Sequence, residues 1–305
     1  MPASDFDIVT GAFGYTGGYI TKHLLRMGRK VLTLTRHVDR PNPFGEALTV
    51  APPSFEDPDQ LTRRLRGANT LYNTYWIRFP CGQATFERAV ENTKILLRAA
   101  EAAGVRKIVH VSVTNAAETS PLPYFRGKGL AEAAIMRSRL ACAIIRPTLI
   151  FGAGDILINN MAWLLRHLPV FALPGSGAYR LQPIAAEEVA EIAVSAAQGT
   201  GNRVIDAAGP DTFTFAELVR LIRDATGSRA RIVRVHPAVA LALSRVVSVL
   251  VRDVMLTRDE VRGLMAGLLV SDAPPAGRMR FRDWLTENAD TVGIQYASEL
   301  ARHFR

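Results

Sequence analysis

The sequence predicts an α/β protein with a doubly wound parallel sheet and a smaller, mostly helical C-terminal domain. Near its start, two short apolar runs, "FDIVT" and "KVLTLT", enclose a glycine-rich turn and an amphipathic segment that stops at Gly28. This order of strand, turn, helix and strand is typical of a parallel α/β unit. Further strand and helix patterns alternate up to about residue 150, and the parallel pattern then breaks off. We therefore expect one nucleotide-binding fold and one added domain.

Composition and cysteine content set the broad class. The chain has 305 residues, of which 48% are hydrophobic and 21% are charged, as is ordinary for a globular protein with a large core. Its two cysteines have no metal-site spacing, and we expect reduced thiols in a cytoplasmic protein, with Cys142 buried on a strand. The first residues lack a basic region and a long apolar run, so we expect no secretory signal.

The basic charge leaves several partners open. The 37 basic and 28 acidic residues give a net charge of +9, and the basic residues are scattered rather than blocked. A solvated surface explains this, but so would attraction to an anionic cofactor, substrate or membrane surface. No nucleic-acid recognition module is recognisable, so no nucleic-acid partner is expected. The stretch Ala238 to Leu256 is apolar but is interrupted by Arg245 and Arg252, which predicts a buried or partly buried helix, with peripheral membrane contact as the alternative.

The glycine-rich turn predicts a dinucleotide site. A pyrophosphate is bound by backbone N–H groups at a helix N-terminus, and a glycine removes the Cβ that would stand between them. The first glycine permits the tight turn, the second the close approach, and the third the packing of helix on strand. The predicted cofactor contacts of this turn are Gly11, Phe13, Gly14, Tyr15, Thr16 and Gly17.

The end of the second strand bears on the choice of cofactor. An acidic residue there accepts hydrogen bonds from the adenosine ribose, whereas an arginine pairs with a 2′-phosphate. The stretch "LTLTRHVDR" places Arg36 at this position, nineteen residues after Gly17. We therefore predict NADP(H) in preference to NAD(H). The alternative is that Arg36 is a surface residue and Asp39 accepts from the ribose.

With the preceding threonine, "TGAFGYTG" resembles the fingerprint of extended and atypical short-chain dehydrogenases/reductases, including the NAD-dependent epimerase/dehydratase proteins. The chain also looks related to the nucleotide-binding accessory subunit of respiratory complex I. This resemblance implies further contacts with the cofactor at the ends of the third, fourth and sixth strands. The residues at those positions are Phe55, Asn73, Thr74, Pro147 and Thr148.

The segment from "KIVHVS" to "YFRGK" carries the predicted chemistry. Ser112 ends a buried strand, and Tyr124 and Lys128 are four residues apart, which places both on one face of a helix. A lysine one turn away lowers the pKa of a tyrosine and makes it a usable acid or base. The three residues resemble the Ser–Tyr–Lys constellation of short-chain dehydrogenases. That resemblance implies Tyr124 as acid/base, Lys128 as ribose anchor and pKa modulator, and Ser112 as the group that orients a carbonyl, with Thr114 as the alternative to Ser112.

Candidate substrate residues fall in both domains. Tyr75, Trp76 and Arg78 follow the fourth strand and could clamp a planar or anionic ligand, or simply pack there. In the second domain the candidates are Asn160, Trp163 and Arg180. No metal site is expected.

These patterns assign residues 1–150 and 183–208 to an NAD(P)-binding Rossmann domain and residues 151–182 and 209–305 to a substrate domain. We predict an NADP(H)-dependent oxidoreductase, or an epimerase/dehydratase-like enzyme, acting on a carbonyl or hydroxyl of a small molecule. The alternative is a non-catalytic NADP(H)-binding sensor or structural subunit. The substrate and the oligomeric state stay open.

Overall fold

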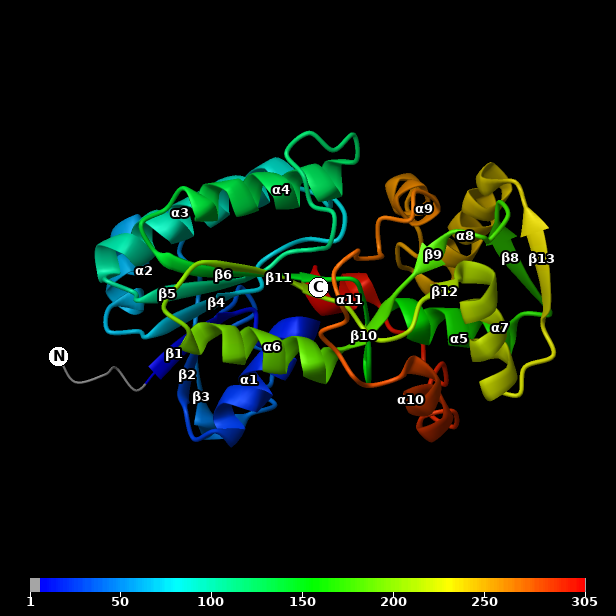
Figure 1. Ribbon diagram of the computed structural model, residues 1–305, viewed down its shortest axis with the longest axis horizontal. Coiled ribbons are helices and arrows are strands. Elements are labelled where there is room, and N and C mark those ends of the chain that lie inside the picture. The colour runs from blue at the N-terminus through cyan, green and yellow to red at the C-terminus, as the bar shows by residue number, and fades with distance from the viewer. Residues whose placement is uncertain (1–5, 305) are drawn as a thin grey trace. The chain divides into compact units, whose positions relative to one another are not determined.

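The computed structural model describes residues 6–304 of the chain (Figure 1). Its internal contacts divide the chain into two compact units. The first unit comprises Met1–Pro147 and Glu187–Asp206, and the second comprises Thr148–Ala186 and Ala207–Arg305. The chain thus leaves the first unit, returns to it once, and leaves it again.

A seven-stranded sheet forms the centre of the first unit. Its strands lie in the order β11-β6-β5-β4-β1-β2-β3. The pairs β1–β2, β2–β3, β1–β4, β4–β5 and β5–β6 are parallel. The strands are β1 (Phe6–Thr10), β2 (Lys30–Leu34), β3 (Leu48–Ala51), β4 (Thr70–Asn73), β5 (Lys107–Val111), β6 (Ala141–Pro147) and β11 (Arg203–Ala207). The order reverses between β1 and β4, which confirms the predicted doubly wound fold.

Helices cover both faces of this sheet. Figure 1 shows α2, α3 and α4 on one face and α1 and α6 on the other. The helices are α1 (Tyr15–Arg26), α2 (Pro58–Leu65), α3 (Phe86–Ala103), α4 (Pro123–Met136) and α6 (Ala186–Gln198), with a short 3₁₀ helix at Gly45–Ala47. Apolar side chains of the strands are fully buried, with Ile8, Leu71, Ile108 and Ile144 each 0% exposed, because a sheet covered on both faces excludes water.

The helix ends follow local sequence signals. The Asp57 carboxylate accepts a hydrogen bond from the N–H of Gln60 (2.9 Å) and begins α2. Gly104 ends α3 with a φ of 74°, a left-handed conformation that suits glycine, as its sequence predicts. Cys142 lies fully buried on β6, which also confirms the sequence-based prediction.

The second unit combines six helices with three two-stranded sheets among its described residues. The sheets pair β7 with β10, β9 with β12, and β8 with β13. Its core is aromatic, with Phe151, Phe281 and Trp284 in mutual contact. The elements are β7 (Leu149–Phe151), α5 (Leu157–His167), β8 (Val170–Pro174), β9 (Arg180–Leu181), β10 (Pro183–Ala185), β12 (Phe213–Thr214), α7 (Phe215–Ala225), β13 (Arg231–Val235), α8 (Pro237–Val251), α9 (Arg258–Met265), α10 (Phe281–Glu287) and α11 (Glu299–His303).

Helix α8 falls in the apolar stretch 238–256, which was predicted to form a buried or partly buried helix. The helix ends at Val251, and one of its faces is buried, through Ala240 and Ser244. Val249 and Leu250 are 78% and 76% exposed, so the helix is partly buried, as one form of the prediction allowed. Within residues 6–304, no helix is both long enough and apolar enough to cross a membrane.

Candidate nucleotide-binding and catalytic site

The glycine turn joins β1 to α1, and the backbones of the turn and the helix are closely packed. Gly11 has a φ of 73°, and its N–H donates to the carbonyl of Leu34 (2.9 Å) in the neighbouring strand. The N–H of Gly14 in turn donates to the carbonyl of Gly11 (2.9 Å). A Cβ on Gly17 would stand 2.2 Å from that same carbonyl oxygen. Helix α1 therefore packs directly on the turn only because residue 17 is glycine.

The first turn of α1 is suited to an anion. Its N-cap residue, Gly14, provides no side chain to cap the helix, and the first turn contains no acidic residue. The backbone N–H groups and the positive end of the helix dipole thus face outward without a competing carboxylate. This is the arrangement in which proteins bind a pyrophosphate, and it is formed by the predicted residues Tyr15, Thr16 and Gly17.

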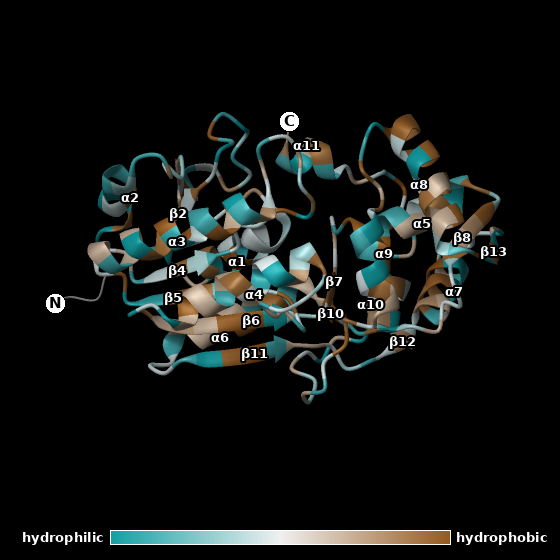
Figure 2. Cartoon of the chain, turned by 90° about the horizontal axis from the view of Figure 1, so that it is seen from above, coloured by the Kyte–Doolittle hydropathy of each residue, from teal (hydrophilic) through white to brown (hydrophobic). Residues whose placement is uncertain are grey.

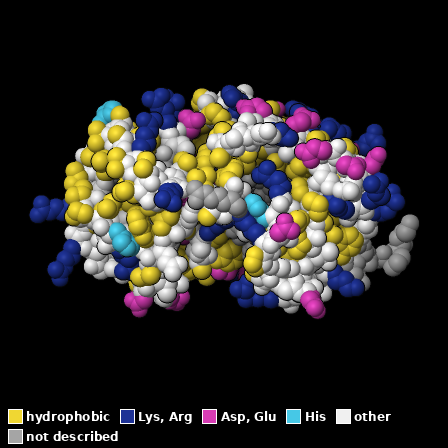
Figure 3. All heavy atoms as spheres, turned by 180° about the vertical axis from the view of Figure 1, so that it is seen from behind, with side chains coloured by type: hydrophobic (Ala, Val, Ile, Leu, Met, Phe, Trp, Pro, Cys, Tyr) yellow, Lys and Arg dark blue, Asp and Glu magenta, His cyan; other side chains and the backbone are white. Residues whose placement is uncertain are grey.

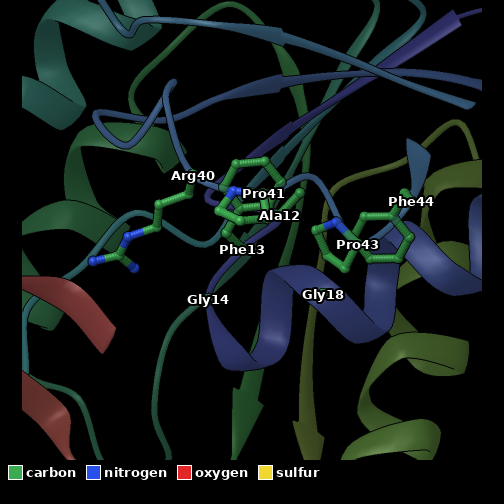
Figure 4. Close-up of a pocket in the computed structure, with 8 residues that line it drawn as sticks. All are labelled: Ala12, Phe13, Gly14, Gly18, Arg40, Pro41, Pro43 and Phe44. Carbon is green, nitrogen blue, oxygen red and sulfur yellow. The ribbon is translucent and has the colours of Figure 1, made fainter. Parts of the chain in front are cut away.

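A pocket of about 360 Å³ opens between this turn and the loop that follows β2 (Figure 4). Figure 4 shows Arg40 at one end of the pocket and Phe44 at the other. The lining residues are Ala12, Phe13, Gly14, Gly18, Arg40, Pro41, Pro43 and Phe44. The loop is stiffened by its two prolines, and it presents a cation and an aromatic ring beside the glycine turn.

The pocket is lined by one arginine, Arg40, which belongs to the loop "DRPNPF" after β2. Arg36, the predicted contact, is exposed and is not among the lining residues. The prediction chose Arg36 from its distance to Gly17. The signal for Arg40 was present in that loop, because two prolines hold an arginine and a phenylalanine close to the end of a strand.

A buried hydrogen-bond network fastens the strands beneath the turn. The Thr10 hydroxyl accepts from the N–H groups of Thr74 (2.8 Å) and Tyr75 (3.0 Å) and donates to Oδ1 of Asn73 (3.1 Å). Nδ2 of Asn73 lies 3.1 Å from Nδ1 of His110, which is fully buried. Asn73, predicted as a cofactor contact, is itself 0% exposed and joins β1, β4 and β5. Thr74 lies directly below the turn, with Oγ1 3.6 Å from the position of a Cβ on Gly11.

Lys128 is the most unusual ionisable group of the first unit. Its side chain enters the protein from α4, and Nζ donates to the carbonyl of Val111 (2.7 Å). The indole ring of Trp76 lies 4.7 Å from Nζ, close enough for a cation–π contact. The residue is 3% exposed, and this burial lowers the pKa of the Lys128 ammonium to about 7, while Glu132, one turn later, partly raises the pKa again.

Tyr124 and Ser112 lie at the same place. Tyr124 is one helical turn before Lys128, and its ring makes edge contacts with Trp76 and Phe86, with centroids 6.2 Å and 6.0 Å apart. Ser112 directly follows Val111, the residue whose carbonyl binds Lys128. The Ser112 Oγ is buried and has no hydrogen-bond partner among the described residues. Tyr124 and Lys128 thus both contact the ring of Trp76, and Lys128 binds the last residue of β5, which Ser112 follows in the chain.

Two glycines let α4 come this close. A Cβ on Gly127 would stand 3.0 Å from two ring atoms of Trp76, so the missing side chain makes room for the indole. A Cβ on Gly129 would stand 2.3 Å from the carbonyl carbon of Ala117, in the loop after β5. Sequence analysis named Trp76 as a substrate contact and did not see its place over Lys128, because nothing local in the sequence links the two residues.

The remaining predicted residues of the first unit make packing contacts. Phe55 belongs to the apolar core and contacts the ring of Tyr75 (5.2 Å between centroids). The Tyr75 hydroxyl accepts from Nδ2 of Asn92 (2.8 Å). The guanidinium of Arg78 lies 5.6 Å from the ring centroid of Phe79.

Pro147 and Thr148 lie where the chain passes from the first unit to the second. The carbonyl of Pro147 accepts from the N–H of Thr114 (3.0 Å), which fixes the end of β6 beside the segment that carries Ser112. Thr148 is buried, and its N–H donates to the carbonyl of Ala207 (3.0 Å).

The candidates in the second unit pack within it. Asn160 exchanges two hydrogen bonds of 2.9 Å with the backbone of Ala297 and so holds the C-terminal segment to α5. Trp163 stacks on His167, with centroids 4.6 Å apart. Arg180 lies exposed on β9. No group of three or more His, Cys, Asp and Glu side chains within residues 6–304 is arranged to hold a metal ion.

The sheet, the uncapped helix after the glycine turn and the adjoining pocket define a nucleotide-binding α/β protein of the oxidoreductase and epimerase fold class. Residues 11–153 match the family model described as NAD(P)H-binding. The chain is 27% identical, over 90% of its own length and 72% of the relative's, to mitochondrial NADH dehydrogenase [ubiquinone] 1 alpha subcomplex subunit 9 of Arabidopsis thaliana. It spans less than two thirds of three further relatives of that name.

Solved structures agree on the fold. The triphenylmethane reductase of Citrobacter sp., complexed with NADP(H), superposes with a TM-score of 0.73 over 93% of this chain and all of its own, at 17% identity. A nucleoside-diphosphate-sugar epimerase from Staphylococcus aureus superposes with a TM-score of 0.73 over 92% of this chain and 99% of its own, at 15% identity. Both likenesses concern the fold.

Proposed function

We propose that the protein is an NADP(H)-dependent oxidoreductase that acts on a carbonyl or hydroxyl group of a small-molecule substrate. The observation that carries the catalytic part is Lys128. A lysine that is 3% exposed and has a pKa of about 7 is costly to bury, and such groups concentrate at functional sites. It lies beside Tyr124 and an unpartnered Ser112 hydroxyl, the groups that proton transfer to a carbonyl oxygen requires.

The residues of the first unit fit the cofactor. The first turn of α1 would hold the pyrophosphate, and the pocket beside it would hold the adenosine portion between Phe13 and the loop 40–44. Arg40 at one end of that pocket supports a 2′-phosphate, and hence NADP(H) over NAD(H), with exposed Arg36 as a second cation close by in the chain. A bound nicotinamide supplies or accepts a hydride.

Residues of the chain itself would transfer the proton to or from the substrate oxygen. Tyr124 donates its phenolic proton to the substrate oxygen, or removes it in the reverse direction. Lys128 in its charged form lowers the pKa of that phenol through its positive charge. The Ser112 hydroxyl donates a hydrogen bond to the same oxygen and orients it. Since the lysine has a pKa of about 7, activity should depend steeply on pH around neutrality.

A second candidate is a non-catalytic NADP(H)-binding subunit or sensor. The observation that favours it is the similarity to the plant protein, which is named as a subunit of NADH dehydrogenase. An epimerase, as in the Staphylococcus aureus protein, is a further form of the enzymatic proposal. The two free cysteines support the reducing, cytoplasmic compartment that we propose for the chain.

A titration of the purified protein with NADPH and NADH, followed by nicotinamide fluorescence, tests the cofactor proposal. We expect NADPH to bind more tightly, and we expect Arg40→Ala to weaken NADPH about tenfold or more while leaving NADH nearly unchanged. Arg36→Ala shows whether the second arginine shares the phosphate, and Arg63→Ala, an exposed arginine on α2, is the matched control. Equal affinity for both cofactors in the wild type would contradict the proposal.

Tyr124→Phe separates an enzyme from a binding protein. We expect this variant to bind NADPH as the wild type does and to lose at least about a hundredfold of its turnover on the best substrate from a panel of aldehydes and ketones. Tyr296→Phe in the second unit, whose hydroxyl donates to Asp253 (3.0 Å), controls for the loss of a hydroxyl as such. Tight NADPH binding with no turnover in the wild type, on this panel and on nucleotide sugars, would support the non-catalytic candidate.

A further inference from the structure

Helix α8 presents an apolar face that no part of the described chain covers. Ala240 and Ser244 are its buried positions and pack it onto β8. The exposed positions are spaced by four, three and four residues, which puts them on one stripe of the helix. This stripe comprises Val239, Leu243, Val246 and Leu250, exposed by 47%, 48%, 60% and 76%, and Val249 lies beside it at 78%. Figure 2 shows the hydrophobic residues along α8.

The surroundings of this stripe are basic. Arg245 lies exposed on α8 itself, and Arg231 and Arg234 lie exposed on β13, which leads into the helix. Between residues 225 and 258 the chain has six arginines and a single acidic residue, Asp253. That carboxylate is buried and accepts hydrogen bonds from the N–H groups of Glu299 (2.8 Å) and Leu300 (3.0 Å). In Figure 3, lysine and arginine side chains border hydrophobic ones on the face shown.

We infer that α8 is a peripheral anchor that lies in the surface of a membrane rich in anionic phospholipids. An amphipathic helix binds there by burying its apolar face at the boundary of the acyl chains while arginines pair with the phosphates. The charge argues against a second copy of the chain as the occupant, because pairing would bring the same arginines together. It also argues against an uncharged lipid surface, which would leave the arginines without a counter-charge.

Sedimentation of the full-length protein with lipid vesicles tests this inference. We expect binding to vesicles that contain phosphatidylglycerol, little binding to pure phosphatidylcholine, and a decline in binding as salt is added. Leu250→Asp should weaken binding by roughly tenfold to a hundredfold, because the side chain no longer enters the apolar layer. Ile294→Asp, which changes a 53% exposed residue elsewhere in the second unit, should bind as the wild type does.

Charge reversal and a solution measurement complete the test. Arg245→Glu should weaken binding to the anionic vesicles, whereas Arg63→Glu on α2 should not. Equal binding to both kinds of vesicle, or binding to neither, would overturn the inference. So would a dimer in light scattering that Leu250→Asp abolishes, because the helix would then be covered by a second copy. All variants should retain wild-type NADPH affinity, so this result is independent of the proposed reaction.

Discussion

Lys128 is a buried side chain with a lowered pKa, which its position in the sequence alone does not suggest. On an isolated helix, a lysine four residues after a tyrosine would be a solvated cation. Here α4 turns the side chain inward, Nζ donates a hydrogen bond to the carbonyl of Val111, and the ring of Trp76 covers the ammonium group. Burial then shifts the balance between ammonium and amine into the neutral range of pH.

This shift predicts how stability depends on pH. The pKa of Lys128 is about 7 in the folded chain and about 10.5 when unfolded, so the unfolded chain binds more protons between those values. The free energy of unfolding should therefore rise with pH across this window, by up to about 1.4 kcal/mol per unit, and this contribution should fall as pH decreases toward 7. Urea denaturation at about pH 7 and about pH 9 should show this slope in the wild type and lose it in Lys128→Met.

Lys94→Met on α3 is the control for this measurement, because Lys94 is 46% exposed and its substitution should leave the slope unchanged. The same slope in the wild type and in Lys128→Met would mean that Lys128 is charged in the folded chain at neutral pH.

Individual residues also mark the limits of sequence reasoning. Tyr124, Lys128 and Ser112 could be chosen because a helical spacing and a strand end are local signals, and the structure does place Tyr124 and Lys128 on α4 and Ser112 directly after β5. The place of Trp76 over Lys128 could not be deduced in the same way. The two residues lie far apart in the chain, and only the packing of whole elements brings them together.

Helix α1 depends on the contact between Gly17 and the turn beneath it. Gly17→Ala would put a methyl group 2.2 Å from the Gly11 carbonyl oxygen, and backbone cannot yield as a flexible side chain does. We expect a loss of about 3 kcal/mol in the free energy of unfolding, together with weaker NADPH binding, because the turn must deform. Chemical denaturation and the NADPH titration measure the two effects.

Gly18→Ala is the matched variant on the same helix. Its Cβ would lie 3.2 Å from the carbonyl oxygen of Ala12, a tight contact that a small adjustment relieves, and alanine favours the helix. We expect a change of less than about 1 kcal/mol. If the two variants lost the same stability, the contact with the Gly11 carbonyl would not be the cause of the loss.

At the level of elements, the alternation of strands and helices was readable because buried parallel strands are apolar runs and helices carry caps. The capping box of Thr214 and Glu217 at α7 and the end of α3 at Gly104 are examples. Helix α8 was predicted as buried or partly buried, and the structure shows it partly buried. Its apolar residues occupy more than one face, and composition does not tell which face the fold covers.

Each of the two units has a hydrophobic core among residues 6–304. The core of the first includes Ile8, Leu71 and Ile108, and that of the second includes Phe151 and Leu218. We expect two transitions in scanning calorimetry, of which NADPH raises only the one that belongs to the first unit. Leu218→Ala, at a 0% exposed position, should lower the other by about 5–10 °C. A single transition that NADPH shifts as a whole would contradict this expectation.

The order of the strands in the sheet affects how the chain folds during its synthesis on the ribosome. Strand β6 ends at residue 147, but β11, its neighbour at the edge of the sheet, begins only at residue 203. On the ribosome, the hydrogen-bonding edge of β6 therefore waits for more than fifty residues to be added, which takes roughly 3–12 seconds. During that interval the nascent chain exposes an unpaired, apolar strand edge. Such edges pair with strands of other chains and lead to aggregation. The need for chaperones during synthesis should accordingly be greatest while residues 148–203 are being translated.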